Sequence, residues 1–187
     1  MLRGELKYLI FNKPYGVLCQ FTDKLGRPTL ADYIPIKGVY SVGRLDFDSE
    51  GLLLLTNDSQ LNHRLSDPRH KQPKTYWVQV EGIPTNTALK SLEKGVVIGG
   101  KKTLPARVKR LADVKVWDRS KPIRFRKNIP TAWLEITICE GMNRQIRKMT
   151  AAVGFPTLRL IRVGIGNLKL GDLKPGKFLF IDRPENS

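Results

Sequence analysis

Four carboxylates and one arginine stand close together within GRLDFDSEGLLLLTND, at residues 43–58. The acids are Asp46, Asp48, Glu50 and Asp58, and the arginine is Arg44. Because Asp46 directly follows a strand-like run that ends in VGRL, a scaffold can hold it at the floor of a cleft. A buried carboxylate without a cationic partner takes up a proton, so an ionised functional acid predicts a specific Arg or Lys beside it. The alternative is a polar turn whose acids are solvated.

The segment EGMNRQIRKMTAAVG, at residues 140–154, offers such a cation. Its apolar spacing predicts a helix that starts near Met142. On this helix Arg147 lies on one face, and Arg144 and Lys148 lie on the adjacent stripe. Arg147 can then reach inward and pair with Asp46; the alternative is an ordinary basic amphipathic helix with solvated arginines.

Two aromatic residues lie in the alternating segment KTYWVQV, at residues 74–80. Alternation predicts a strand with Tyr76 on one face and Trp77 on the other. Such side chains usually pack in a core. On a cleft wall, however, an aromatic ring can stack on an extruded base, and a phenol can transfer a proton.

The net charge points to a polyanionic partner. The 187 residues include 33 Lys and Arg against 17 Asp and Glu, a formal charge of +16. Residues 1–60 hold seven basic and seven acidic residues, so the excess lies entirely in residues 61–187. The segment 101–127 alone has eleven basic residues against two acids. Such an excess indicates attraction to phosphates or anionic surfaces rather than any particular fold.

Nucleic acid is a better partner than a membrane. No apolar run approaches the ~20 residues of a membrane span, and the N-terminus lacks the features of a secretory signal. We therefore expect a cytoplasmic protein without membrane association. The main phosphate-binding surface is expected to comprise Lys101, Lys102, Lys109, Arg110, Arg124, Arg126 and Lys127. Phosphate neutralisation by these residues would make nucleic-acid affinity depend steeply on salt.

No cofactor or metal is expected. Cys19 and Cys139 lie in apolar runs without a CxxC spacing and are expected to be free, buried thiols. His63 and His70 are too few and too isolated for a zinc centre. No GxGxxG or Walker A pattern follows a strand, so a nucleotide cofactor has no evident cradle.

The element pattern predicts an α+β protein with a mostly antiparallel mixed sheet and a few short helices. Strands are expected at 7–14, 16–22, 39–46, 51–58, 74–82, 96–111 (two short ones), 132–141, 157–171 and 177–181. Helices are expected at 59–68, 85–95 and 142–154, with a helical turn in 26–35. The lack of regular strand–helix alternation argues against a doubly wound parallel sheet. No linker marks a second domain, so residues 1–187 are expected to form one domain with two lobes around a cleft.

These motifs together resemble a known family. GRLDFDSEGLLLLTND resembles the catalytic signature of the pseudouridine synthases, in the branch that acts on bacterial ribosomal RNA and is named for the small-subunit enzyme. LIFNKPYGVLCQFTD, KTYWVQVEG, EGMNRQIRKM and RVGIGNLKLGDLKPGKF resemble the same branch in the same order. The resemblance covers nearly the whole chain. It implies the family's catalytic fold with a central cleft, and isomerisation of one uridine in large-subunit (23S) rRNA.

The resemblance also implies roles for individual residues. Asp46 matches the essential aspartate, and Arg147 matches the basic residue that pairs with it. Tyr76 matches the tyrosine that packs on the target base and is proposed to move a proton at its C5. Arg44 matches an arginine that fills the gap left by a flipped nucleotide. Leu160, or its neighbour Ile161, is expected under the uracil. Arg144 is expected among the residues that bind the RNA substrate.

Many members of this branch begin with a small RNA-binding module, and the resemblance here starts at the catalytic part. RNA selection is then expected to reside in the catalytic domain and its basic surface. A monomer that binds ribosomal RNA is the default expectation. Two other functions stay open: a ribosome-associated RNA-binding protein without activity, and a DNA-binding regulator, although no helix-turn-helix, zinc finger or basic zipper is evident.

Overall fold

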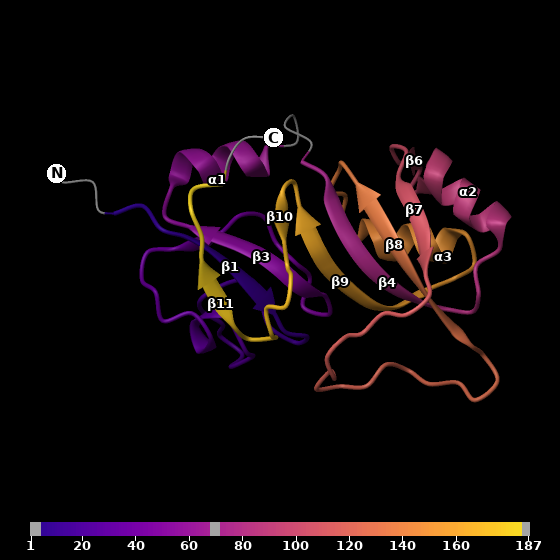
Figure 1. Ribbon diagram of the computed structural model, residues 1–187, viewed down its shortest axis with the longest axis horizontal. Coiled ribbons are helices and arrows are strands. Elements are labelled where there is room, and N and C mark those ends of the chain that lie inside the picture. Colours follow the sequence, from indigo (N-terminus) through magenta and orange to yellow (C-terminus); the bar gives the residue numbers. More distant parts are fainter. Residues whose placement is uncertain (1–4, 68–71, 185–187) are drawn as a thin grey trace.

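The computed structural model describes residues 5–67 and 72–184. A nine-stranded mixed sheet runs through the molecule in the order β11-β1-β3-β9-β4-β8-β7, with β2 on β3 and β10 on β9 (Figure 1). Its strands are β1 (Tyr8–Lys13), β2 (Tyr40–Ser41), β3 (Glu50–Thr56), β4 (Lys74–Glu81), β7 (Arg107–Leu111), β8 (Thr131–Ile138), β9 (Thr157–Ile165), β10 (Leu168–Lys169) and β11 (Phe178–Phe180). β5 (Val97–Ile98) and β6 (Lys101–Lys102) form a separate hairpin. The predicted α+β class is confirmed.

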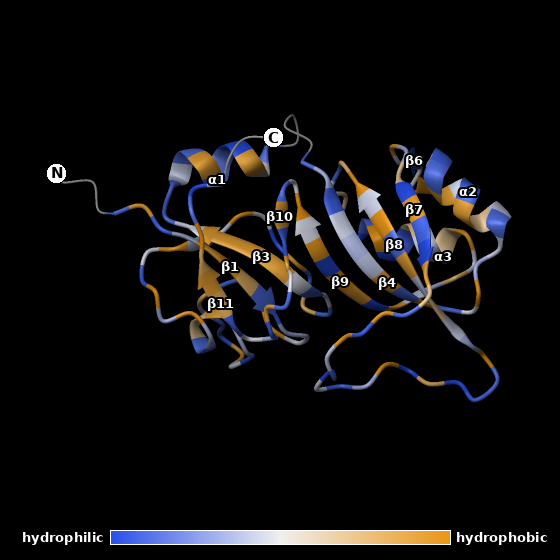
Figure 2. Cartoon of the chain, viewed as in Figure 1, coloured by the Kyte–Doolittle hydropathy of each residue, from blue (hydrophilic) through white to orange (hydrophobic). Residues whose placement is uncertain are grey.

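The burial pattern follows the hydrophobic pattern of the sequence. All residues of β1 and β3 are buried, as expected for strands that are covered on both faces. Figure 2 shows β3 as apolar over most of its length, whereas the long connection between β7 and β8 is mostly polar. β4 alternates as predicted: Tyr76, Val78 and Val80 are buried, and Trp77 and Gln79 are only partly covered.

Within the described residues, three α-helices flank the sheet. α1 (Ser59–Ser66) is capped by Asp58, whose carboxylate accepts the Leu61 N–H. α2 (Asn86–Lys94) is capped by Thr85 and ends at Gly95, as predicted. α3 (Gln145–Ala152) and α2 both pack on the face of the sheet that carries Tyr76 and Val78.

Three local predictions were wrong. α3 begins three residues later than expected because Arg144 adopts a left-handed conformation (φ 51°), which ends helical geometry there. Residues 16–22 do not form a strand. The Leu18 N–H donates to the Pro28 carbonyl and the Leu30 N–H donates to the Gln20 carbonyl, and these two bonds close a loop. The strand predicted at 39–46 is limited to β2, since Gly43 turns the chain with φ 68°.

The two halves of the sheet meet at the parallel pair β3–β9. Only two residue pairs join these strands, Glu50 with Ile161 and Gly51 with Arg162. Gly51 has φ 102°, and a Cβ there would overlap the backbone of Arg162. Arg162 also crosses the junction, donating from Nε to the Leu52 carbonyl at 2.8 Å. The sequence therefore needs glycine at position 51 for close approach.

We predict that Gly51→Ala lowers the free energy of unfolding by roughly 2–4 kcal/mol, combining left-handed backbone strain with overpacking against a backbone that cannot move aside. Chemical denaturation measures this loss. Gly38→Ala is the matched control, because Gly38 also has positive φ (78°) but has nothing within 4 Å of an added Cβ. Equal losses in the two variants would contradict a special role for the junction.

Candidate active site

Asp46 lies in a short turn between β2 and β3, and the turn is anchored on both sides. The Leu45 N–H donates to the buried Cys19 sulfur at 3.2 Å. The Ser49 N–H donates to the Asp46 carbonyl at 3.0 Å, which leads the chain into β3. The side chain of Asp46 stays 36% exposed, so it can meet a ligand.

A cavity of about 680 Å³ surrounds this carboxylate. Asp46, Arg44 and Val42, from the connection between β2 and β3, line it together with Tyr76 of β4 and Leu160 of β9. Tyr76 and Leu160 are otherwise buried, so each presents only a small surface to the cavity. Arg144, Lys101 and Lys102 are among the charged residues of its lining. The structure thus brings an acid, a phenol, an aliphatic side chain and several cations to one hollow.

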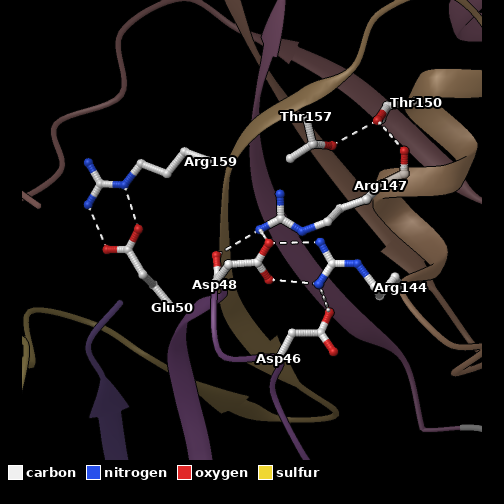
Figure 3. A network of polar contacts seen from close by, with 8 residues as sticks. All are labelled: Asp46, Asp48, Glu50, Arg144, Arg147, Thr150, Thr157 and Arg159. Carbon is white, nitrogen blue, oxygen red and sulfur yellow. Dashed lines mark hydrogen bonds and ion pairs between the residues drawn. The ribbon is translucent and has the colours of Figure 1, made fainter. Parts of the chain in front are cut away.

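Four ionic side chains, Asp46, Asp48, Arg144 and Arg147, form a cluster beside the cavity (Figure 3). Arg144 binds Asp48 with two hydrogen bonds, of 2.9 and 2.7 Å, and its Nη1 lies 3.6 Å from Asp46 Oδ2. Arg147 Nη2 lies 3.4 Å from Asp48 Oδ2 and donates to the Asp48 carbonyl at 2.7 Å. Asp48 is therefore held between two guanidinium groups.

The expected ion pair between Arg147 and Asp46 is not formed in this structure. Arg147 projects from the first turn of α3 toward Asp48, and it does not line the cavity. Arg144 takes the place next to Asp46 because its left-handed backbone turns it out of the helical arrangement assumed from the sequence. Such a backbone conformation costs about 1–3 kcal/mol in a non-glycine residue and is concentrated at functional sites.

The electrostatics of the cluster follow from burial and charge. Burial alone would raise the pKa of the Asp48 carboxyl, but the hydrogen bonds of Arg144 and the charges of Arg147 and Arg144 outweigh it and lower that pKa. The bonds to Asp48 raise the pKa of Arg144. Burial lowers the pKa of Arg147, and the charge of Asp48 opposes this. The two guanidinium groups thus hold Asp48 in its ionised form.

Two buried ionic groups next to the site were not predicted from the sequence. Glu50 and Arg159 form a two-bond ion pair, with both bonds at 2.8 Å, across the two halves of the sheet. Lys13 is fully buried and donates from Nζ to the Pro14 and Val17 carbonyls, both at 2.8 Å. Burial lowers the pKa of Lys13 to about 8. In both cases the sequence did contain an indication of a buried charge, namely a charged residue at a buried position of an apolar strand.

The seven residues of the predicted phosphate-binding surface do not share one cavity. Lys101 and Lys102 line the Asp46 cavity, whereas Lys109 lines a second cavity and pairs with Glu135 at 3.0 Å. Arg110 bonds to the Pro84 carbonyl. Arg124 and Arg126 both pair with Glu81, at 2.9 and 3.1 Å, and Lys127 is exposed. Charge density along the sequence therefore overstated how closely these side chains cluster in space.

The cysteines, histidines and acids suggest no metal centre. Cys19 is buried and free as predicted, whereas Cys139 is free but exposed and lines the Asp46 cavity, contrary to expectation. Across residues 5–67 and 72–184 no three His, Cys, Asp or Glu side chains are grouped to hold a metal ion. His70 lies outside these residues. Within the same ranges no helix is long and apolar enough to span a membrane.

We predict that Asp48→Asn lowers the free energy of unfolding by about 1 kcal/mol at pH 7, a value discounted for partial exposure. Because the folded-state pKa of Asp48 is lowered, its contribution is complete above the unfolded pKa of about 4 and is lost as pH falls through the folded value. Chemical denaturation should show a smaller difference in the free energy of unfolding between the wild type and Asp48→Asn at pH 3 than at pH 7. Asp113→Asn, at an exposed acid, should show no difference at either pH; a constant Asp48 effect would contradict the assignment.

Known proteins are similar to this chain along nearly its whole length. The sequence pattern of the family described as RNA pseudouridylate synthase matches residues 7–152. Ribosomal large subunit pseudouridine synthase E of Vibrio vulnificus is 57% identical over 181 residues, covering 97% of this chain and 77% of the relative. The protein of the same name from Xanthomonas campestris is 56% identical over 173 residues, covering 91% and 92%.

A solved pseudouridylate synthase structure superposes with a TM-score of 0.80 at 29% identity, covering 97% of this chain and 72% of that one. Sequence pattern, relatives and backbone agree with one another on the family. The chain belongs to the RNA pseudouridine synthase family.

Proposed function

We propose that this protein converts one uridine of large-subunit (23S) ribosomal RNA into pseudouridine, with Asp46 as the reacting carboxylate. The main support is the meeting of Asp46, Tyr76 and Leu160 in one cavity within a chain of this family. The substrate class is taken from relatives named ribosomal large subunit pseudouridine synthase E, at 56–58% identity.

The reaction rearranges the atoms of one nucleotide. The N1–C1′ bond breaks, the uracil turns, and a C5–C1′ bond forms, while the proton on C5 moves to N1. Substrate and product have the same atoms and oxidation state. The target nucleotide must leave its stack, at a cost of a few kcal/mol, before it can enter the cavity.

Two routes begin with the same carboxylate. Asp46 attacks C1′ as a nucleophile, or it removes the proton at C2′ as a base; both require the ionised form. Arg144 places a positive charge 3.6 Å from Asp46, while Asp48 fixes Arg144 in place. Arg147 acts one step further away, by holding Asp48. Arg144 is therefore the immediate cationic partner in this proposal.

The remaining cavity residues bind and orient the nucleotide. The Tyr76 ring packs against the uracil and its hydroxyl moves the proton from C5, while Leu160 supports the base from a neighbouring strand. Arg44 fills the gap that the flipped nucleotide leaves in the RNA. Lys101 and Lys102, at the cavity rim, bind flanking phosphates.

We predict that Asp46→Asn lowers the single-turnover rate of pseudouridine formation by at least about 10³-fold while RNA affinity changes little, because the phosphate contacts lie elsewhere. Pseudouridine mapping in transcribed 23S RNA and a filter-binding titration give the two readouts. Asp182→Asn, at an exposed acid, is the control and should keep both the rate of pseudouridine formation and the RNA affinity. Wild-type protein that binds the RNA without forming pseudouridine would favour the alternative of a non-catalytic ribosome-associated binder.

We predict that Tyr76→Phe retains RNA binding but slows product formation by about 10²–10⁴-fold, since the ring remains and the proton-transfer hydroxyl is lost. Single-turnover kinetics with the target RNA measure this effect. Tyr40→Phe, at an exposed tyrosine outside the cavity, is the matched control. An unchanged rate in Tyr76→Phe would assign Tyr76 to packing alone.

A further inference from the structure

A second and larger cavity, of about 1010 Å³, lies on the opposite face of the sheet. Strand alternation separates the two: Tyr76 lines the Asp46 cavity, and the next residue, Trp77, lines the second. α2 and α3 pack on the Tyr76 face, so no described helix covers the Trp77 face of β4 and β8. The lining also includes Trp117, from the long connection between β7 and β8 (Figure 1).

The second cavity is strongly basic. Five cations line it, Arg107, Lys109, Lys115, Lys169 and Lys174, against two acids, Glu135 and Asp172. Glu135 is already occupied by Lys109 at 3.0 Å and by the Trp77 indole at 3.2 Å. The other four cations have no ion pair in the described part of the chain, and all are exposed. A ligand with several negative charges would neutralise them.

The two tryptophans leave mainly ring surface for a ligand. The Trp77 N–H donates to Glu135, and the Trp117 N–H donates to Glu50 at 2.8 Å. Both indoles therefore have their polar group satisfied within the protein, and both remain partly uncovered. Aromatic rings beside unpaired cations are typical of sites for single-stranded nucleic acid, where bases stack and phosphates pair with Lys and Arg.

The two cavities reach the same end of the sheet. Lys74, at the start of β4, pairs with Ile138 of β8 and Ile165 of β9, and all three line the Asp46 cavity. Their neighbours Thr75, Thr137 and Gly164 line the second cavity. A single strand of nucleic acid that passes around this end of the sheet can therefore occupy both cavities.

We propose that the second cavity binds a single-stranded segment of the RNA substrate beside the target uridine. The proposal rests on RNA being the substrate and adds a binding site remote from the reacting carboxylate. Bases stack on Trp77 and Trp117, while Lys115, Lys169 and Lys174 bind phosphates. Such a site adds affinity and selects targets with an unpaired flank, because paired bases cannot stack on protein rings.

The test uses Trp fluorescence and an oligocytidylate of about ten nucleotides, a length within the usual span of single-strand sites. This probe has no uridine, so its binding is independent of isomerisation and of Asp46. Lys115→Glu/Lys174→Glu is compared with Lys90→Glu/Lys94→Glu, two exposed lysines of α2 outside both cavities. Both variants change net charge equally, and circular dichroism confirms that each is folded.

We expect the wild-type protein to show quenching on binding. Lys115→Glu/Lys174→Glu should bind about 10-fold more weakly, with a salt slope shallower by about 1, and the control should stay within about 2-fold. Equal weakening in both variants, or no quenching in the wild type, would overturn the proposal. Tighter binding of oligoglutamate than of oligocytidylate would overturn it as well, and would assign the cavity to an acidic protein segment.

Discussion

Charge pairing between the two halves of the chain holds the site together. Three acids of the first half, at alternating positions 46, 48 and 50, meet three arginines of the second half, at 144, 147 and 159. The innermost pair, Glu50 with Arg159, is almost fully buried and has two hydrogen bonds at 2.8 Å. Removal of one partner from a buried pair leaves an uncompensated charge, so such a pair strongly disfavours any other arrangement of the halves.

The gradient of burial along these three acids fits a catalytic site. Glu50 is 1% exposed, whereas the side chains of Asp48 and Asp46 are 30% and 36% exposed. The deepest acid fixes the sheet junction, the middle one fixes two guanidinium groups, and the outermost faces the cavity. A rigid inner pair thereby limits the movement of an acid that must remain open to its substrate. Gly51 contributes by allowing β3 and β9 to approach at this point.

The sheet also explains how one thin structure presents two different surfaces. Residues alternate across β4, so a buried tyrosine and a half-buried tryptophan in adjacent positions face opposite sides. Helices cover part of one side, and a long polar connection borders the other (Figure 2). The positive charge of the second half of the chain is divided between these sides, with Lys101 and Lys102 at one cavity and Lys109 and Lys115 at the other.

Much of the fold and several site residues were predictable from the sequence. The α+β class, the alternation of β4 and the capped helix α2 follow from local periodicity and capping chemistry, which depend only on neighbouring residues. Asp46, Arg44, Tyr76 and Leu160 were selected by a resemblance to the pseudouridine synthases, and the structure places all four around one cavity. Their roles in the reaction stay proposals.

Other features depended on contacts between distant residues. The sequence alone identified an acid and a nearby basic segment, but it did not show that Arg144, through its left-handed backbone, would take the position assigned to Arg147. It also missed the pairing of Glu50 with Arg159, which lie 109 residues apart, and the division of the basic residues between two faces. Local pattern determined which elements form and which side chains they carry. Only tertiary packing decided which charges meet, because ion pairing depends on distance in space, which the order of residues does not contain.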